Sequence, residues 1–258
     1  MEQGSTRYER DGVIARVTFD RQAARNAMTW AMYDQLAAAC EKIAADPEVR
    51  VAVFRGAGGK AFVAGTDIGQ FKEFKSGEDG IDYERRMAEY LSAVEQIPVP
   101  TLAVIEGWAI GGGLAIACAC DLRIATPGTR FGVPIARTLG NCLSVENYAL
   151  VAAAFGVSRA KKMLMLAENL TAEEAAAAGF LCEIVPPEKL DSRAQELCDR
   201  LAKNAPITMR VTKESIRRLL HAGLPSGEDL IRECYGSEDF HEGVEAFVAK
   251  REPRWQGK

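Results

Sequence analysis

The segment from Ile105 to Leu114 contains three consecutive glycines, Gly111 to Gly113, which lead directly into a very apolar predicted helix. Glycine loses more conformational freedom on folding than any other residue, so three in a row need a physical reason. One explanation is a turn packed too tightly for any Cβ atom. The other is that main-chain N–H groups at the start of a helix stay free to bind a ligand oxygen. The residues alone leave both explanations open.

A second glycine-containing loop, Gly65-Thr66-Asp67, can supply another such N–H group. Two converging main-chain donors form an oxyanion hole, in which the loss of one donor lowers the rate by about 10²–10³. The two loops therefore predict a site for a carbonyl or anionic oxygen, without indicating which compound carries it.

The overall composition argues against several other kinds of site. The net charge is −4 with acids and bases interspersed, whereas a general nucleic-acid binder has a basic face. The two histidines, His221 and His241, lack metal-ligand spacing, so we expect no metal. The seven cysteines include no CxxC pair, so we interpret them as reduced thiols. Neither a secretory leader pattern nor an apolar run of about 20 residues occurs, so we expect a cytoplasmic protein that binds no membrane.

The elements that must position these loops begin with a hairpin over residues 8–19, with a tight turn at Asp11-Gly12. Thr29 is expected to cap the first helix. The polar, glycine-containing stretch 76–80 is predicted to be a mobile loop, and a helix is predicted over residues 82–96.

Strands and helices alternate as far as the break at Pro186-Pro187, after which the pattern is entirely helical. These features predict an α/β core over residues 1–188 and a helical C-terminal region over residues 189–258. The remaining strands are expected over residues 49–55, 61–64, 101–105, 122–125 and 181–185, and helices over residues 144–155, 159–167 and 171–178.

Several short motifs together resemble the crotonase superfamily, the enoyl-CoA hydratase/isomerase family, along essentially the whole chain. Any one of them alone is a weak signal, but the combination is specific. The two glycine loops match that family's two oxyanion loops. The matching segments are Asp20-Arg21, Arg25-Asn26-Ala27, residues 46–50, 60–62 and 64–68, Gly107, Gly111-Gly112-Gly113, Cys120-Asp121, Phe131-Gly132, and residues 175–179 and 247–255.

This resemblance implies a spiral of ββα units and a C-terminal helical trimerisation region that builds a homotrimer or a hexamer of two trimers. It implies an acyl-CoA thioester as substrate and no permanently bound cofactor. The thioester carbonyl oxygen would accept the N–H groups of Thr66 and Gly112. Charge drawn onto that oxygen stabilises an enolate, which the family's hydrations, isomerisations and decarboxylations share.

The resemblance also implies a set of substrate-contacting positions. The CoA adenine would lie beside Ala24, Arg25, Ala64 and Ile68. Lys60 or Arg25 could attract the CoA phosphates, although each is equally well explained as a solvated surface charge. The complete set is Ala24, Arg25, Lys60, Ala64, Asp67, Ile68, Gly111, Ala115, Ile135 and Arg137.

The chain departs from the family at two positions that matter for proton transfer. Hydratases of this family usually carry one glutamate shortly after the glycine triplet and another after the proline that follows the Phe-Gly pair. Those positions are Ala115 and Ile135 in this sequence, and neither side chain can transfer a proton. A placed acid–base group contributes about 10²–10⁴ to a rate, so ordinary hydration needs a replacement.

Four polar residues in the segment after Ile135 are candidates for that replacement or for substrate binding. Asn141 and Ser144 can orient a water molecule but are poor bases. Glu146 is better explained as an acid in the first turn of a helix, where it complements the helix dipole. Arg137 is equally consistent with an anchor for a substrate carboxylate and with a surface charge.

Tyr83 and Glu84 lie on the helix that follows the predicted mobile loop, which in this family borders the acyl pocket. We nevertheless favour the interpretation that both belong to the solvated face of that helix. Asp67 and Asp121 match structural positions of the motifs, so we interpret them as supports of a loop and a helix end.

The first functional hypothesis is an enzyme of the enoyl-CoA hydratase/isomerase type with a displaced acid–base group. A decarboxylase or thioester hydrolase is a variant of it, because decarboxylation needs an enolate but no glutamate pair. The second hypothesis is a non-catalytic acyl-CoA-binding homologue, which Ala115 and Ile135 favour and the intact oxyanion loops oppose. The identity of the acyl group stays open.

Overall fold

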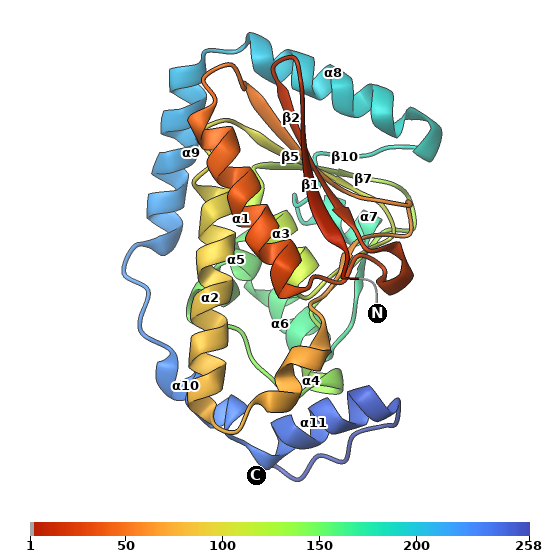
Figure 1. Cartoon of the computed structure of the whole chain (residues 1–258), viewed down its shortest axis with the longest axis vertical. Coiled ribbons are helices and arrows are strands. Elements are labelled where there is room, and N and C mark those ends of the chain that lie inside the picture. The colour runs from red at the N-terminus through yellow and green to blue at the C-terminus, as the bar shows by residue number, and fades with distance from the viewer. Residues whose placement is uncertain (1–2) are drawn as a thin grey trace.

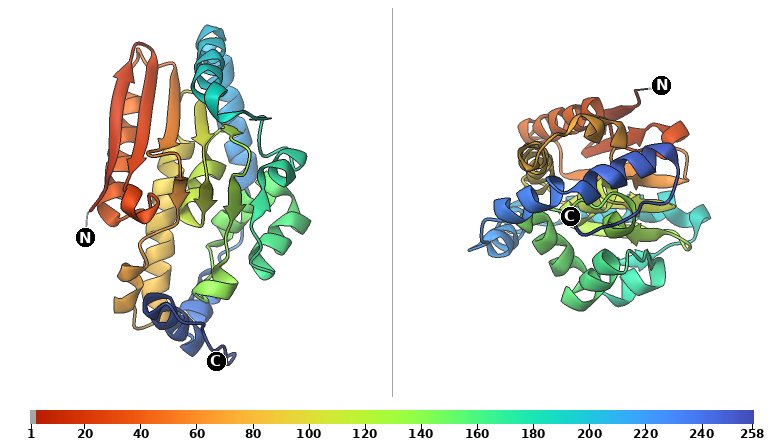
Figure 2. Two further views of the ribbon diagram at one scale, coloured as in Figure 1. Left: turned by 90° about the vertical axis from the view of Figure 1, so that its right-hand side faces the viewer. Right: turned by 90° about the horizontal axis from the view of Figure 1, so that it is seen from below.

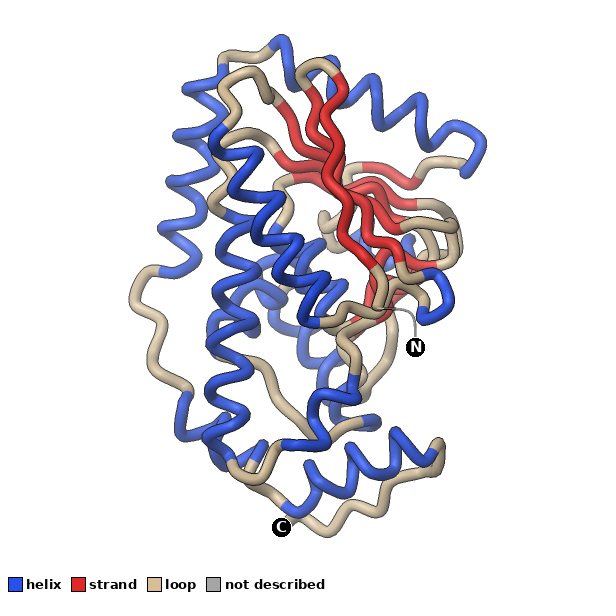
Figure 3. Tube along the Cα trace, viewed as in Figure 1, coloured by secondary structure: helices blue, strands red, loops and turns tan. Residues whose placement is uncertain are grey.

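The computed structural model describes residues 3–258, which form two β-sheets surrounded by helices (Figure 1). The strands are β1 (Ser5–Asp11), β2 (Ile14–Asp20), β3 (Val51–Gly56), β4 (Ala61–Ala64), β5 (Thr101–Ile105), β6 (Trp108–Ile110), β7 (Leu122–Ala125), β8 (Arg130–Gly132), β9 (Leu170–Thr171) and β10 (Glu183–Ile184). The helices are α1 (Trp30–Ala45), α2 (Gly77–Glu95), α3 (Gly112–Ala119), α4 (Ile135–Thr138), α5 (Val145–Phe155), α6 (Val157–Met165), α7 (Ala172–Ala177), α8 (Leu190–Lys203), α9 (Pro206–His221), α10 (Glu228–Tyr235) and α11 (Glu238–Ala249), with short 3-10 helices η1 (Gln22–Ala24), η2 (Ile68–Glu73) and η3 (Pro187–Lys189). The predicted α/β core followed by helices is confirmed (Figure 3).

The larger sheet has the strand order β1-β2-β3-β5-β7-β10, with every pair parallel except β1–β2. Figure 2 shows the β1–β2 hairpin at one edge of the molecule. The predicted hairpin is confirmed, but its turn lies one residue further on than expected. Asp11 pairs with Ile14, which leaves Gly12 and Val13 as the turn, and Gly12 supplies the positive φ of 58° that such a turn needs.

The smaller sheet has the order β4-β6-β8-β9, in which β4, β6 and β8 are parallel to one another. The carboxyl ends of neighbouring parallel strands lie at one edge of a sheet, where ligands of α/β proteins commonly bind. Both glycine loops follow strands of this sheet, since Gly65 comes directly after β4 and Gly111 directly after β6. The smaller sheet therefore brings the two loops together.

The helix α1 begins where Thr29 was predicted to cap it, and the Thr29 side chain accepts a hydrogen bond from the Met32 N–H group. By contrast, the prediction of a mobile loop over residues 76–80 is wrong, because α2 begins at Gly77. The Asp79 carboxylate accepts the N–H groups of Lys75 and Ser76, which fixes that helix start.

The two glycines that suggested a loop serve close packing instead. An ideal Cβ atom on Gly77 would lie 2.3 Å from the Arg232 carbonyl oxygen, and one on Gly80 would lie 2.2 Å from the Tyr235 ring. Glycine at these two positions lets α10 lie directly against the first turns of α2, as Figure 1 shows.

The C-terminal helices complete both hydrophobic cores. Tyr235 and Phe240 are fully buried in the main core, together with α1, α2 and the smaller sheet. Leu190 and Cys198 on α8 pack in a second core with β3, β5 and β7, on the other face of the larger sheet. The division of the chain at residue 188 stays a prediction. No helix within residues 3–258 has the combined length and apolar character that would let it cross a membrane.

Candidate functional site

A cavity of about 160 Å³ lies at the carboxyl ends of β4, β6 and β8, between α2, the segment 139–151 and α11. Nine of the residues predicted for the site line it. They are Ala64, Thr66, Ile68, Glu84, Gly111, Gly112, Ala115, Ile135 and Asn141. The resemblance therefore selected residues from five separate segments that the fold does bring together.

The two glycine loops are held side by side by main-chain hydrogen bonds. Ala64 at the end of β4 is in register with Ile110 at the end of β6, and the Gly111 N–H group donates to the Gly132 carbonyl at 2.8 Å. On the other side of the first loop, the Met28 N–H group donates to the Gly65 carbonyl at 2.9 Å. These contacts fix both loops relative to the smaller sheet.

The N–H groups of Thr66 and Gly112 stand out within the described part of the chain because neither has a hydrogen-bond partner there. Gly112 is the first residue of α3, where a helix leaves its N–H groups unsatisfied. The helix dipole also favours negative charge at this end. An electron-rich ligand oxygen would satisfy both groups.

Tyr33 on α1 stands between these two loops. Its hydroxyl group lies 2.8 Å from Thr66 Oγ1, and an ideal Cβ atom on Gly112 would lie 2.4 Å from the same hydroxyl oxygen. The ring is fully buried, and burial raises the pKa of Tyr33 well above its usual range. Tyr33 is thus a neutral spacer that fixes the separation of the two loops.

Tight packing, the first explanation of the glycine triplet, is confirmed, whereas the binding of a ligand oxygen by its N–H groups stays a prediction. Gly111 has a positive φ of 53°, which most side chains disfavour. An ideal Cβ atom on Gly113 would lie 2.0 Å from the Val63 carbonyl oxygen, so α3 approaches β4 too closely for any side chain. Tight packing and a free N–H group at Gly112 are therefore two consequences of one geometry.

Glu84 is the buried carboxyl of the cavity, with only 2% of the residue exposed. Its Oε1 accepts a hydrogen bond from the Tyr235 hydroxyl at 2.8 Å, and its Oε2 accepts one from the Ser144 N–H group at 2.8 Å. Burial raises the pKa of Glu84 to about 7, although these hydrogen bonds and one from Asn147 oppose the shift. A carboxyl with that pKa can both accept and release a proton near neutral pH.

The interpretation of Tyr83 and Glu84 as a solvated helix face is wrong. Both side chains are buried, and both line the cavity. The helix α2 is covered on this side by α10 and by the segment 139–147, neither of which the local sequence around Glu84 reveals.

Asn141 supplies the second polar group that is available to a ligand. Its Nδ2 donates to the Tyr235 hydroxyl at 3.2 Å, while its Oδ1 is buried without a partner among the described residues. A buried amide oxygen without a partner carries a free-energy penalty, which a bound water or ligand donor would relieve.

Several other predicted residues do not line the cavity. Ser144 contributes only its N–H group to Glu84, and its side chain caps α5. Glu146 lies in the first turn of α5, where the helix dipole was expected to hold it. Asp67 forms an ion pair with Arg21 at 2.8 Å, as expected of a loop support, and therefore does not face the cavity.

The predicted cations also lie outside the cavity. Arg25, Lys60 and Arg137 are all exposed and do not line the cavity, and the role of Arg137 as an anchor for a substrate carboxylate stays a prediction. Ala24 belongs to η1, which adjoins the cavity because the Arg25 carbonyl accepts the Ala64 N–H group at 3.1 Å. Arg25 and Lys60 stay candidates for contacts with a ligand that extends beyond the cavity.

Among the residues of the site that the sequence did not reveal are Tyr33, Asn147, Tyr235 and Phe247. Tyr235 is the most distant, since 151 positions separate it from its partner Glu84. The glycines at 77 and 80 were a usable signal, because they mark the surface on which Tyr235 packs. Asn147 and Phe247 have no distinguishing pattern in the sequence.

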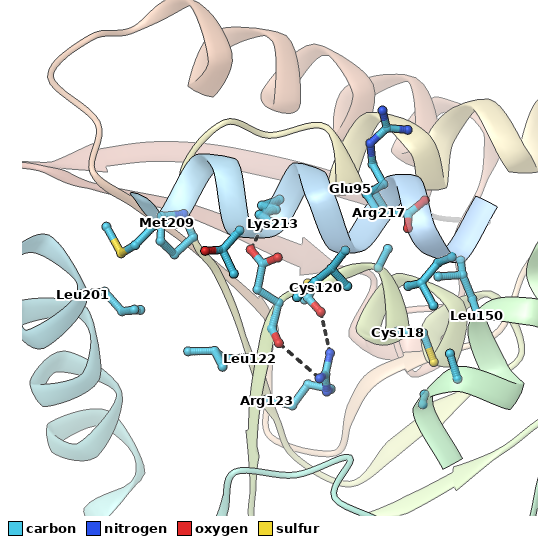
Figure 4. Close-up of a pocket in the computed structure, with 18 of the residues that line it drawn as sticks. Glu95, Cys118, Cys120, Leu122, Arg123, Leu150, Leu201, Met209, Lys213 and Arg217 are labelled. Carbon is cyan, nitrogen blue, oxygen red and sulfur yellow. Dashed lines mark hydrogen bonds and ion pairs between the residues drawn. The ribbon is translucent and has the colours of Figure 1, made fainter. Parts of the chain in front are cut away.

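A larger cavity, of about 580 Å³, lies between α3, α5 and α9, and Figure 4 shows residues from these helices around it. None of the predicted site residues lines it. Its cation Lys213 pairs with Asp121 at 2.7 Å, and Arg217 pairs with Glu214 at 2.9 Å. Within residues 3–258, no group of three or more His, Cys, Asp or Glu side chains could hold a metal ion.

Comparisons with known proteins show which family the chain resembles along its length. The family model described as enoyl-CoA hydratase/isomerase matches residues 9–258. The chain is 31% identical over 255 residues to the short-chain-enoyl-CoA hydratase of Clostridium acetobutylicum, with 97% of each chain covered. It is 30% identical over 246 residues to the 2,3-dehydroadipyl-CoA hydratase of Escherichia coli, with 94% of each covered. A solved structure of methylmalonyl-CoA decarboxylase in complex with 2-nitronate-propionyl-CoA has a TM-score of 0.90 and 26% identity, with 98% of this chain and 99% of that one covered.

Proposed function

This chain belongs to the enoyl-CoA hydratase/isomerase family, and from that premise we propose that it adds water to an enoyl-CoA thioester with Glu84 as its acid–base group. The thioester oxygen accepts the N–H groups of Thr66 and Gly112. The observation that carries the proposal is the buried Glu84 carboxyl in the same cavity as these two unpaired N–H groups.

The two N–H groups draw electrons from the double bond toward the thioester oxygen. This makes the β carbon electrophilic and stabilises the enolate that forms when a nucleophile adds there. Their effect is largest in the transition state, because the oxygen then carries more negative charge than in the bound substrate. Each donor is expected to contribute about 10²–10³ to the rate.

Glu84 transfers the proton in the same reaction. In its ionised form it removes a proton from a water molecule whose oxygen bonds to the β carbon. The resulting carboxylic acid then donates that proton to the α carbon of the enolate, which restores the carboxylate. The free Asn141 Oδ1 accepts the other hydrogen of the water and orients it. The sum of these steps is the addition of one water molecule.

The remainder of the CoA lies outside the cavity in this proposal. Ala64 and Ile68 lie at the cavity and flank the adenine, with Ala24 beside them, while the exposed Arg25 and Lys60 attract the phosphates. We propose that the helical region over residues 189–258 also assembles the chain into a trimer or a hexamer, and that the protein acts in the cytoplasm without a bound cofactor.

A decarboxylase is the second candidate, and one observation favours it, namely the TM-score of 0.90 to methylmalonyl-CoA decarboxylase. Loss of carbon dioxide also needs only the enolate-stabilising N–H groups. Against it, no Lys or Arg among the described residues lines the cavity, and Arg137 is exposed, so a substrate carboxylate would find no cation there. We therefore favour hydration over decarboxylation and over thioester hydrolysis.

The proposal is tested by measuring the turnover of crotonyl-CoA through the loss of its enoyl absorbance. We expect Glu84→Gln to lower kcat by about 10²–10⁴, because the amide cannot transfer the proton. Glu146→Gln is the matched control, since Glu146 is a nearby acid that does not line the cavity. Equal rates for wild type and Glu84→Gln would contradict the role of Glu84. Tight CoA binding without turnover of any acyl-CoA would favour the non-catalytic alternative.

A further inference from the structure

The inner part of the cavity is unusually poor in charge. Apart from the two loops, its walls are mainly apolar, and the polar side chains there belong to Tyr83, Glu84, Thr138, Asn141 and Asn147. The apolar residues outside the two loops are Phe71, Met87, Leu91, Ala115, Val133, Pro134, Ile135, Leu139, Leu143, Val151 and Phe247.

In the part of the chain that the structure describes, Glu84 is the one acidic side chain that lines the cavity, and no lysine, arginine or histidine accompanies it there. Its two carboxyl oxygens are held by neutral donors, the Tyr235 hydroxyl and the Ser144 N–H group. The surrounding side chains therefore provide no positive charge that would compensate a second carboxylate in the cavity.

We propose that this site selects uncharged, apolar acyl groups and that Glu84 excludes acyl groups that end in a carboxylate. The inference rests on the proposed function, because it assumes that the acyl chain enters this cavity. A carboxylate there would lose its hydration without gaining a cation, which is unfavourable in an apolar cavity. It would also be repelled by the ionised Glu84 at close range.

The repulsion is large enough to measure. Two like charges about 6 Å apart at an effective dielectric of about 20 repel enough to weaken binding about 100-fold. The apolar walls add a further penalty that does not depend on pH. Charge repulsion and loss of hydration can thus be separated by titrating Glu84.

Several titratable groups face Glu84 from the elements packed against it. Burial raises the pKa of each of the four tyrosines among them, so these stay neutral near pH 7. Contact between Cys142 and Cys234 raises the pKa of the first thiol and lowers that of the second. The complete set is Tyr33, Tyr83, Cys142, Glu146, Tyr148, Cys234 and Tyr235.

Calorimetric binding of three saturated acyl-CoA esters of similar length tests the inference without any turnover. Butyryl-CoA has an apolar end, succinyl-CoA a carboxylate, and succinamoyl-CoA the neutral amide of the same shape. We expect succinyl-CoA to bind about 100-fold more weakly than succinamoyl-CoA at about pH 8, and the difference to shrink at about pH 6, where Glu84 takes up its proton.

The variant Glu84→Gln measures the effect of the carboxyl group on binding separately from the effect of the apolar walls. Glutamine can keep both contacts, because its oxygen accepts the Ser144 N–H group and its amide donates to the Tyr235 hydroxyl. We expect the variant to bind succinyl-CoA better than the wild type at about pH 8 and to lose the pH dependence. A pH dependence that persists in the variant would overturn the role of Glu84 and implicate Cys234 instead.

The outcomes also distinguish this inference from the proposed function. If none of the three esters binds, the proposed function fails. If all three bind equally at both pH values, the acyl-CoA site stands and the selection against carboxylates is overturned. Butyryl-CoA serves as the internal reference, because its affinity is expected to change little between about pH 6 and about pH 8.

Discussion

Two regions of the site lie at one cavity but are assembled by different means. The first is the pair of N–H groups of Thr66 and Gly112. The second, called the carboxyl cluster here, is the Glu84 carboxyl with its donors Ser144 and Tyr235. The first region consists of main-chain atoms from two loops that follow adjacent strands, β4 and β6. The second consists of the Glu84 side chain and its hydrogen-bond donors from distant segments, since Glu84 is 60 positions from the Ser144 N–H group and 151 from the Tyr235 hydroxyl.

This difference bears on how the family's chemistry can change. A main-chain N–H group is present whatever the residue, so it can be displaced but not removed by a substitution other than proline. A carboxyl group can be lost at one position and supplied at another, provided that burial and hydrogen bonds give it a suitable pKa. In this chain Ala115 and Ile135 line the cavity without any proton-transfer ability, and Glu84 lies in the same cavity.

Within the first region, the largest effect that we expect follows from Gly112→Ala, which displaces the two loops. The new Cβ atom would lie 2.4 Å from the buried Tyr33 hydroxyl and 2.9 Å from Thr66 Oγ1, so the two loops must separate. We expect kcat for crotonyl-CoA to fall by about 10²–10³, the effect of losing one oxyanion donor.

A second substitution tests whether that loss comes from the contact with Tyr33. In Tyr33→Phe/Gly112→Ala the hydroxyl is absent, and the nearest ring atom, Cζ, would be 3.7 Å from the Cβ atom. The double variant should recover activity by about tenfold relative to Gly112→Ala, because close neighbours have non-additive effects. A double variant no more active than Gly112→Ala would show that Tyr33 does not set the loop spacing.

The same contrast explains how far the sequence could predict the structure. The glycine loops were predictable because Gly111 to Gly113 satisfy local requirements of backbone angle and close approach. The strand ends at Ala64 and Ile110 were predictable for the same reason, since apolar strands bounded by glycine are local patterns.

The carboxyl cluster was not predictable in this way. The burial of Glu84 depends on α10 and on the segment 139–147, and nothing local to the helix α2 indicates that these will cover it. Gly77 and Gly80 were misinterpreted as a mobile loop, because a glycine required by a distant partner looks the same as a glycine in a turn. The short elements β8, β9 and α4 also depend on their neighbours for their existence.

The next effect in size concerns stability and is specific to the second region. The pKa of Glu84 is raised from 4.5 to about 7 in the folded protein, so folding stabilises its protonated form. The stability that Glu84 contributes is therefore present below about pH 4.5 and is lost as the pH rises through about 7, by on the order of 3 kcal/mol. Glu84→Gln has no such titration. Urea unfolding between about pH 5 and pH 8 should show the variant gaining stability relative to the wild type, and parallel curves would contradict this.

A smaller effect is expected from Tyr235→Phe, which keeps the ring in the core and removes one hydrogen bond to Glu84. If Glu84 acts as a base, kcat/KM for the wild type rises with pH and levels off above about 7. The Tyr235 hydrogen bond lowers the pKa of Glu84, so its loss should move the midpoint of the profile upward by about one pH unit. An unchanged midpoint would show that another group controls the profile.

The smallest effect is expected from Tyr33→Phe alone, a substitution next to the N–H groups of Thr66 and Gly112. The substitution removes the hydrogen bond to Thr66 Oγ1 and leaves the N–H groups of Thr66 and Gly112 in place. A neutral hydrogen bond contributes about 0.5–1.5 kcal/mol, so kcat should fall by about tenfold or less. Because Tyr33 does not titrate near neutral pH, the midpoint of the pH profile should stay where it is, in contrast to Tyr235→Phe. A shifted midpoint in Tyr33→Phe would mean that the two regions are coupled through Thr66 and Tyr83 and are not independent parts of the site.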